Sequence, residues 1–390
     1  MSEPVQRVMV MVTPSSFGRR ILNGVSTYVR PTRSWVMQIS INTEPGHLQQ
    51  LRRWEPTGII AHMGSEQVVS DFKQWGVPLV NVSNAVRGND PPHVGEDDHA
   101  VGVMAAEHLL EKGLEHFAFC GDLSRGYACD RRDGFRQTVT ALGFDCDEFA
   151  LLPNAAQMAY LSGNYLSSDS ERALLDWLAQ LPKPTGILVY QDYMGFILCE
   201  LCRQAGIRIP EELAIIGVDD DETACDFAYP PISSVRSPLE MVGYEAARVL
   251  DQLMRGTSAP EHPILLQPSA VTVRQSTDIT VCADPDLALA LRYIRSHADQ
   301  PIQVDDLLNE VLISRRSLES KFKQHLNRTP LSEIHRVHVE QAKRLLTETQ
   351  LPIPRVAESS GFTNAAQMNT VFRKYVGTTP SDYRKRPNRA

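Results

Sequence analysis

Short apolar runs alternate with amphipathic stretches over the first three quarters of the chain. The first runs, apolar almost throughout, are residues 7–12, 35–41, 58–63 and 78–83. Runs of this kind are typical of parallel strands that are covered on both faces. The alternation begins again at residues 116–121, where HFAFCG precedes an amphipathic stretch at 130–143, and it continues to VRQST at 273–277. The pattern therefore predicts two successive doubly wound α/β lobes with a cleft between them.

The last hundred or so residues show only helical periodicity, and they contain an internal repeat. Pairs of equivalent residues lie 50 positions apart: Leu318 and Met368, Phe322 and Phe372, and Pro330 and Pro380. The repeat predicts two helix-turn-helix motifs, at 304–326 and 353–376, after a first helix near 286–298. One amphipathic helix through Ile334 and Leu345 is expected to join them. The predicted fold class is a two-lobed α/β domain followed by an all-α domain.

The second motif shows each part of a helix, a sharp turn and another helix. Gly361 supplies the positive φ that ends the first helix, and Asn364 can cap the second. Met368 and Phe372 point inward at helical spacing. The opposite face is small, polar or basic, and it carries Ala365, Ala366, Asn369, Thr370, Arg373 and Lys374. Small residues let a helix enter a major groove while Arg and Lys meet phosphates, so the motif predicts DNA binding.

The charge distribution favours the same partner. Residues 287–390 carry 17 Lys and Arg against 10 Asp and Glu, a net charge of +7, whereas residues 1–286 carry 22 against 37, a net charge of −15. A basic tail on an acidic body is expected where a nucleic-acid module is joined to a domain that does not bind nucleic acid. A random fluctuation in surface charge does not explain why the basic excess coincides with the two motifs.

The C-terminal residues also resemble a known family. The GF dipeptide at 361–362, the Met and Phe spaced four residues apart, the TP dipeptide at 379–380 and YR at 383–384 resemble the second helix-turn-helix of AraC/XylS-type transcription regulators. The resemblance implies a bipartite reader whose first recognition helix runs from about 314 to 324. Its two recognition helices are expected to enter successive major grooves on one face of the DNA, about 34 Å apart.

The DNA contacts expected from this resemblance fall on both recognition helices. In the first helix they are Arg315, Arg316, Ser317, Glu319 and Ser320. Arg316 suits a bidentate contact with a guanine edge, and Glu319 can accept a hydrogen bond from cytosine. In the second helix they are Asn364 and the six residues of the small and basic face. The first turn departs from the family, because Leu312 stands where Gly is usual; leucine resists positive φ, so this turn is expected to be reshaped or strained.

The α/β part resembles a second family. EHLLEKG at 107–113, RRDGF at 131–135, IPEELAIIGVDD at 209–220 and VRQST at 273–277 resemble the effector domain of LacI/GalR regulators, which is related to periplasmic sugar-binding proteins. The resemblance covers about residues 5–277. Members of that family carry a helix-turn-helix before this domain, whereas here nothing precedes the first strand. DNA reading is therefore expected at the other end of the chain.

A sugar pocket needs polar groups for adjacent hydroxyls and aromatic rings for C–H faces. Ligands of doubly wound sheets bind at the carboxyl ends of strands, and the residues found there are the candidate contacts Phe17, Arg19, His62, Arg131, Gln191 and Asp219. Arg131 lies where the resemblance places a sugar-contacting arginine, and Asp219 ends the run IIGVD. Asp192 is expected to be a helix cap, and Asp220 and Asp221 to be turn residues.

Other function classes find less support. The chain has no GxSxG, P-loop or HExxH motif, and its acidic run lacks the spacing of a calcium loop, so neither an enzyme nor a metal site is expected. Cys199 and Cys202 lie in an apolar helical run and are interpreted as buried thiols, with a metal or redox pair as the alternative. No apolar run approaches the length of a membrane span, about 18 residues. A transport-type binding protein would need a signal peptide, which the N-terminus does not resemble.

The two families together resemble sugar-responsive regulators of pentose operons. The expected organisation is an effector-binding domain at 1–277, a linker at 278–286 and a DNA-binding domain at 287–390. The resemblance implies a cytoplasmic transcription activator that needs no cofactor and whose effector is a monosaccharide, with D-xylose as the expected one. Its implied partners are operator DNA, a second copy of the chain in a homodimer, and RNA polymerase. A regulator that senses another sugar, or one that represses, is the alternative.

Overall fold

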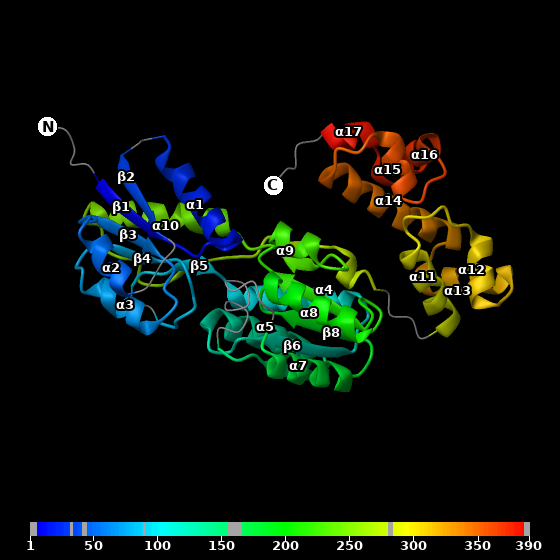
Figure 1. Cartoon of the computed structure of the whole chain (residues 1–390), viewed down its shortest axis with the longest axis horizontal. Helices are drawn as coiled ribbons and strands as arrows, with labels where there is room; N and C mark the ends of the chain where they lie inside the picture. Colours follow the sequence, from blue (N-terminus) through cyan, green and yellow to red (C-terminus); the bar gives the residue numbers. More distant parts are fainter. Residues whose placement is uncertain are drawn as a thin grey trace. The chain divides into compact units, whose positions relative to one another are not determined.

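The chain folds as two compact units, Met1–Thr280 and Val281–Ala390. The computed structural model describes residues 6–31, 34–40, 45–88, 91–153, 166–279 and 284–385. The first unit is α/β and the second is helical (Figure 1). Residues 280–283 of the linker expected at 278–286, which include Cys282, lie outside the described residues.

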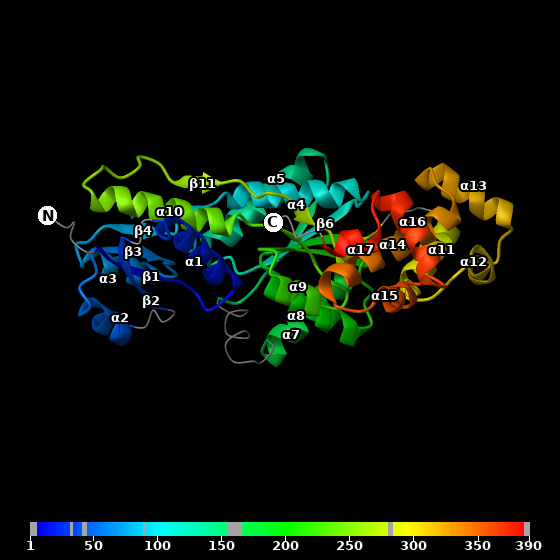
Figure 2. The same cartoon turned by 90° about the horizontal axis from the view of Figure 1, so that it is seen from above.

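The N-terminal lobe of the first unit is a parallel sheet with helices on both faces. Its strands, in spatial order, are β2 (Trp35–Ser40), β1 (Gln6–Met11), β3 (Gly58–Ala61) and β4 (Leu79–Asn81). Helices α1 (Ser16–Val29) and α10 (Leu239–Met254) cover one face and α2 (Pro45–Arg52) and α3 (Glu66–Lys73) the other (Figure 2). Successive residues of β1 serve opposite faces, since Val8 packs in the cluster of Ile21 and Met9 in that of Phe72.

The second lobe repeats this construction. Its strands, in spatial order, are β12 (Val271–Thr272), β10 (Ser233–Val235), β9 (Leu213–Val218), β8 (Thr185–Val189), β6 (His116–Gly121) and β7 (Cys146–Ala150). The edge strand β12 runs antiparallel to β10, and the others are parallel. The helices are α4 (Asp98–Glu111), α5 (Gly126–Ala141), α7 (Ser168–Gln180), α8 (Asp192–Ala205) and α9 (Glu222–Phe227). The predicted two-lobed, doubly wound fold is confirmed.

The chain crosses between the lobes at three places that are joined by hydrogen bonds. β5 (Val94–Glu96) and β11 (Ile264–Leu266) pair beside the N-terminal lobe. One crossing follows β5, one follows β11, and the third precedes α10. The backbone nitrogen of Asp97 donates to Leu266 O at 2.8 Å, and that of Arg236 to Ala270 O at 2.8 Å. These contacts make the crossings one hinge, so that a cleft lies between the two sheets.

The second unit has two cores that share one helix. Its helices are α11 (Pro285–Ser296), α12 (Val304–Val311), α13 (Arg315–Leu326), α14 (Pro330–Glu348), α15 (Ile353–Ser359), α16 (Ala365–Val376) and α17 (Pro380–Lys385). Ile334 of α14 packs in the first core with Phe322, and Ala342 packs in the second with Phe372. The all-α domain with two helix-turn-helix motifs is thus confirmed, and α14 is the predicted connecting helix.

The turns of the two motifs differ as the sequence indicated. Gly361 has φ 76° after α15, and Asn364 caps α16 by accepting a hydrogen bond from the nitrogen of Gln367. In the first motif Ser314 caps α13, and Leu312 has φ 53°. Of the two expectations for Leu312, the strained turn is the one found. The side chain of this leucine is 85% exposed, so packing does not compensate for the backbone conformation.

Candidate functional site

A cavity of about 680 Å³ lies between the two lobes of the first unit. The loops that follow β1 and β3 form one wall, and the first turns of α5 and α8 with the end of β9 form the other. These are carboxyl ends of parallel strands and the helix starts beside them, which is where doubly wound sheets bind ligands. The volume falls in the range of small-molecule pockets, about 300–1,000 Å³.

The structure brings five of the six candidate ligand contacts to this cavity. They are Phe17, His62, Arg131, Gln191 and Asp219. Arg19 is exposed and lies outside the wall. Each residue of a helix is turned by about 100° from the one before it, and the side chain of the next residue, Arg20, reaches the backbone at the end of β9. Arg20 donates from Nη1 to Asp219 O at 2.7 Å, and its Nε donates to Glu240 Oε1 at 2.7 Å.

Arg131 is the centre of the polar floor, and its side chain is only 8% exposed. Its Nε donates to Asp98 Oδ1 at 2.9 Å, Nη1 to Tyr190 O at 2.6 Å, and Nη2 to Glu96 Oε2 at 3.1 Å. Burial by itself lowers the pKa of Arg131, but the carboxylates of Asp98, Asp219 and Glu96 outweigh it and raise that pKa. The guanidinium therefore stays charged, and every one of its nitrogens is held by the protein.

The two carboxyl groups beside Arg131 differ in how well they are satisfied. Burial raises the pKa of Glu96 to about 8 and that of Asp98 to about 6, although Arg131 attracts both charged forms. Both oxygens of Asp98 have donors, Arg131 Nε and Asn84 Nδ2. Oε2 of Glu96 accepts from Arg131 and from Ser237 Oγ, but Oε1 is buried with no hydrogen-bond partner among the described residues. This oxygen is the unsatisfied polar atom of the floor.

β9 ends in two residues with left-handed backbone, Asp219 at φ 103° and Asp220 at φ 55°. Residues with a side chain rarely adopt these angles, and such strain is usually held in place by surrounding contacts at functional sites. Oδ1 of Asp219 accepts from Ser237 Oγ at 3.2 Å and lies 3.8 Å from Arg131 Nη2. Its pKa is raised because burial outweighs the attraction of Arg131 and Arg20.

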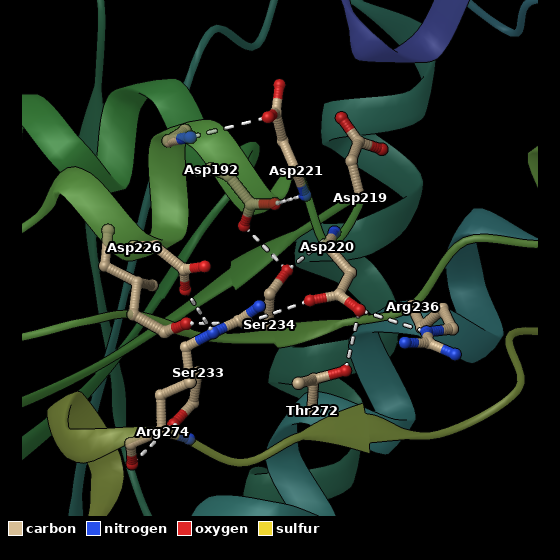
Figure 3. A network of polar contacts seen from close by, with 12 residues as sticks. Asp192, Asp219, Asp220, Asp221, Asp226, Ser233, Ser234, Arg236, Thr272 and Arg274 are labelled. Atoms are coloured by element: carbon tan, nitrogen blue, oxygen red, sulfur yellow. Dashed lines mark hydrogen bonds and ion pairs between the residues drawn. The ribbon is translucent and has the colours of Figure 1, made fainter. Parts of the chain in front are cut away.

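A polar network beyond this corner holds it in place (Figure 3). The carboxylate of Asp220 accepts from Thr272 Oγ1 at 2.7 Å, Arg274 Nη1 at 2.9 Å and Arg236 Nε at 3.0 Å. The carboxylates of Asp219 and Asp220 point in opposite directions in Figure 3. The left-handed pair thus leaves Asp219 in the cavity wall and anchors Asp220 to the edge strand and the hinge.

Asp192 is not the helix cap that its position predicted. Gln191 occupies the cap position of α8, and Asp192 is 1% exposed below the cavity. It accepts from Ser234 Oγ at 2.6 Å and from the backbone nitrogen of Asp221 at 2.8 Å, and burial raises its pKa well above the ordinary value. Because Ser234 Oγ in turn accepts from the nitrogen of Asp220, Asp192 braces the corner from within.

Aromatic rings complete the wall. Phe17 and His62 meet edge to face with ring centroids 5.7 Å apart, and Tyr127 and Tyr190 lie parallel with centroids 6.2 Å apart. Burial and the nearby charge of Arg125 lower the pKa of His62 to about 4, so this ring is neutral at pH 7. Neutral rings next to fixed carboxylates and a guanidinium suit a small ligand that carries several hydroxyls and C–H faces.

Several wall residues were missed from the sequence. They are Glu96, Asp98, Tyr127 and Tyr190. Tyr127 shares a helix face with Arg131 four residues later, so helical spacing was a usable signal. The sequence at 96–98 predicted a helix start. Only the fold shows that Glu96 ends β5 and lies in the floor of the cavity.

The first recognition helix presents one arginine that is free of intramolecular contacts. Arg315 lies 3.8 Å from Asp305 and 3.7 Å from Glu319, atom to atom, in exposed ion pairs. Arg316 is exposed and forms no hydrogen bond or ion pair with any residue that the structure describes. The remaining predicted contacts of α13, Ser317 and Ser320, are half-buried and exposed, respectively. The helix thus offers Arg316 to a partner.

The second recognition helix presents fewer hydrogen-bonding groups. Its exposed predicted contacts are Asn364, Ala366, Thr370, Arg373 and Lys374, whereas Ala365 and Asn369 are half-buried. The side chain of Asn364 is engaged as the cap, and Thr370 Oγ1 donates to Ala366 O at 3.1 Å. The free polar groups of this face are therefore mainly cationic, which suits contacts with phosphates.

Within the described ranges, no cluster of three or more His, Cys, Asp or Glu side chains could hold a metal ion. Cys199 and Cys202 are fully buried, as interpreted from the apolar run. No helix in the described part of the chain is long and apolar enough to cross a membrane.

Residues 106–277 match the family model of a periplasmic binding protein-like domain, and residues 307–386 match that of a helix-turn-helix domain. The chain is 30% identical over 377 residues to the xylose operon regulatory protein of Escherichia coli (strain K12), covering 95% of this chain and 94% of that protein. It is 28% identical over 393 residues to the corresponding protein of Haemophilus influenzae, covering 98% and 99%.

Solved structures agree with these matches. The structure of the xylose-binding transcription activator XylR superposes with a TM-score of 0.79 at 29% identity, covering 98% of this chain and 99% of that one. A complex of the transcriptional regulator CelR with cellobiose, 23% identical with a TM-score of 0.56, covers 69% of this chain and 84% of that one and shares the fold of the first unit.

The fold and the comparisons define a DNA-binding transcription regulator with an α/β effector-type unit, and not an enzyme. The chain belongs to the family of xylose operon regulatory proteins.

Proposed function

We propose that this regulator binds D-xylose in the cavity between the lobes of its first unit and then activates genes of pentose catabolism. The observation that carries the proposal is the cavity wall, in which fixed carboxylates, two guanidinium groups and aromatic rings face each other across the lobes. A xylose-binding activator that is similar over 98% of the chain supports the choice of sugar.

The proposed sugar contacts are those that the fold gathers in the wall. Asp219, Arg131 and Gln191 bind hydroxyls, and Phe17 and His62 pack against C–H faces. Arg19 lies outside the wall, and Arg20, which donates to the backbone oxygen of Asp219, is proposed to position that sugar contact.

The second unit is the proposed operator reader, and each motif places one recognition helix in a major groove. The effector-binding domain is proposed at 1–277 and the reader at 287–390, joined by the linker at 278–286. The protein acts in the cytoplasm as a homodimer that contacts RNA polymerase. A sugar that touches both walls favours the closed cleft, in which Arg125 Nη1 of one lobe donates to Gly64 O of the other at 2.6 Å. Closure then changes how the dimer presents its readers.

A thermal-shift screen of pentoses and hexoses tests the sugar assignment. All four tryptophans lie in residues 1–280, so their fluorescence reports the unfolding of the first unit. A ligand at a hundred times its Kd adds about 2.7 kcal/mol to stability, and D-xylose should therefore raise the unfolding midpoint most. Arg131→Ala and Asp219→Ala should abolish the rise, whereas Arg19→Ala, outside the wall, should keep it.

Two results would contradict this proposal in different ways. If no monosaccharide raises the midpoint at millimolar concentration, the unit is not a sugar sensor. If another sugar acts and D-xylose does not, the sensor stands and the choice of sugar is wrong.

A further inference from the structure

Glu96 is a carboxyl group of the cavity floor whose two oxygens differ in their hydrogen bonding. The residue is 8% exposed, it lies in the cavity wall, and β5 carries it there from the hinge side. Its Oε2 already accepts from Arg131 Nη2 at 3.1 Å and from Ser237 Oγ at 2.9 Å. Its Oε1 is buried and has no partner among the described residues. A buried carboxyl oxygen without a hydrogen bond is costly, and because Glu96 lines the cavity, a ligand bound there is the partner that we infer for it.

The charges around this oxygen restrict the ligand that can approach it. The wall contains two arginines, Arg125 and Arg131, against the six carboxyl groups of Glu96, Asp98, Asp122, Asp192, Asp219 and Asp221. Burial raises the pKa of Glu96 to about 8 and that of Asp192 well above its ordinary value, yet four carboxylates still outnumber the two guanidinium groups. Since His62 is neutral, a phosphate or carboxylate on the ligand would meet net negative charge.

We propose that Glu96 is a direct ligand contact that selects an uncharged polyhydroxylated ligand: its Oε1 hydrogen-bonds one ligand hydroxyl, and the acidic wall excludes phosphorylated or carboxylated sugars. The inference rests on the proposed function and adds to it a contact residue and a ligand class. A hydroxyl suits this position because it both donates and accepts, so it bonds Glu96 in either protonation state.

The experiment is a set of calorimetric titrations on the full chain with D-xylose and with its monodeoxy analogues, each of which lacks one hydroxyl. In the wild type, removal of the hydroxyl that meets Glu96 should weaken binding about ten-fold, the loss expected when one buried hydrogen bond is removed. In Glu96→Ala the same removal should cost almost nothing, because the partner atom is already gone. Glu96→Gln keeps an oxygen for Arg131 and Ser237 but places an amide nitrogen where Oε1 was. The loss of affinity on removing that one hydroxyl should therefore differ from the loss in the wild type.

Asp98→Asn is the matched control. Asp98 supports Arg131 from the other side, but both of its oxygens have protein donors. If Glu96 acted only by holding Arg131, Glu96→Ala and Asp98→Asn would change the hydroxyl costs in the same way. Direct contact predicts that Asp98→Asn, even where it weakens sugar binding through Arg131, does not remove the cost of one particular hydroxyl as Glu96→Ala does.

D-xylonate and D-xylose 5-phosphate form the second arm, and both should bind at least a hundred-fold more weakly than D-xylose. If either anion binds the wild type within ten-fold of D-xylose, the ligand class is wrong. If every hydroxyl costs the same in Glu96→Ala and Glu96→Gln as in the wild type, Glu96 touches no ligand. A wild type that binds no neutral sugar at all would instead contradict the proposed function, so the two failures are distinct.

Discussion

Leu312 ends α12 in a backbone conformation that leucine rarely adopts. Its φ is 53°, and its side chain is 85% exposed. The left-handed conformation costs an L-residue roughly 1–2 kcal/mol, and an exposed side chain recovers little of this by packing. The equivalent turn of the second motif uses Gly361, which adopts φ 76° without that cost. The first motif is therefore expected to be less stable than it would be with glycine at position 312.

Leu312→Gly should stabilise the second unit by about 0.5–1 kcal/mol, the relief of strain less the added entropy of the unfolded chain. Gly377→Ala is the opposite control, since Gly377 has φ 76° and open space around its Cα, and it should destabilise by a similar amount. The second unit contains no tryptophan, so the helical circular dichroism signal of residues 284–390 is the measurement. A loss of stability in Leu312→Gly would show that the leucine packs usefully.

Arg316 is the residue on which base recognition is predicted to depend. It is exposed without a partner among the described residues, whereas Arg315 is already near Asp305 and Glu319. Arg316→Ala should cost roughly 1–3 kcal/mol on the cognate site and little on random DNA, because a bidentate contact to guanine is specific.

Arg373→Ala is the comparison for Arg316, since a phosphate contact should weaken cognate and scrambled duplexes alike and reduce the salt slope by about one. Fluorescence anisotropy on both duplexes measures the two variants. An equal loss on the two DNAs for Arg316→Ala would mean that this arginine, too, contacts only phosphate.

At the scale of elements, the corner between β9 and α9 connects the cavity to the hinge. Asp220 accepts hydrogen bonds from Thr272 of β12, from Arg274 and from Arg236, which lies on a crossing between the lobes. These donors, and Arg274 and Arg236 as cations, lower the pKa of Asp220 although its burial opposes this. A group with a lowered pKa contributes stability above its ordinary pKa and loses it as the pH falls, so the clamp is fully formed at pH 6–8.

Asp220→Ala should lower the affinity for the sugar about ten-fold although Asp220 is not in the cavity wall. The left-handed backbone of Asp219 is held by the clamp, and without it Asp219 turns away from the ligand for part of the time. Sugar affinity is measured by calorimetry well below the unfolding midpoint of the variant. Asp226→Asn is the control, because Asp226 contacts the outer side of Arg274 at 2.9 Å and is more exposed. Equal losses in the two variants would contradict a special role for the corner.

The strands that could be predicted from the sequence are those whose side chains are buried on both faces of the sheet. β1, β8 and β9 are buried on both faces and read as apolar runs, whereas the side chains of β7 are half-buried or exposed and leave no such run. The spacing of apolar residues also locates a helix more easily than it shows which of its polar side chains point towards a binding site. This is why α1 was placed correctly although the exposed position of Arg19, outside the cavity wall, was not foreseen.

The candidate site was predictable as far as strand ends could be read. Asp219 follows β9 directly, Gln191 lies two residues after β8, and both lie in the cavity wall. Glu96 was not found, because β5 is three residues long and its place beside the cavity depends on pairing with β11, some 170 residues later. Asp192 was taken for a cap because only the fold shows that Ser234 and the nitrogen of Asp221 converge on it.

At the scale of the whole molecule, the charge asymmetry follows the division into units. The reader holds its own two cores, and its first helix is anchored within the unit: Asp284 caps α11 and forms an ion pair with Lys321. The boundary at 287 expected from the sequence would remove this cap and the first turn of α11. A fragment that begins at Asp284 is therefore expected to fold by itself.

Residues 284–390 should bind operator DNA without the first unit, and with a steep dependence on salt. Residues 284–390 carry 17 Lys and Arg against 12 Asp and Glu, a net charge of +5, and each phosphate that a cation neutralises releases counterions. With about six phosphate contacts, affinity should fall about 10³-fold between 50 and 200 mM salt. A fragment 287–390, which lacks the Asp284 cap, should melt at a lower temperature because an N-cap contributes about 1 kcal/mol. Anisotropy titrations at several salt concentrations, with residues 1–277 as the acidic comparison, decide the matter: a folded 284–390 that binds DNA no better than 1–277 would place the DNA-binding surface elsewhere.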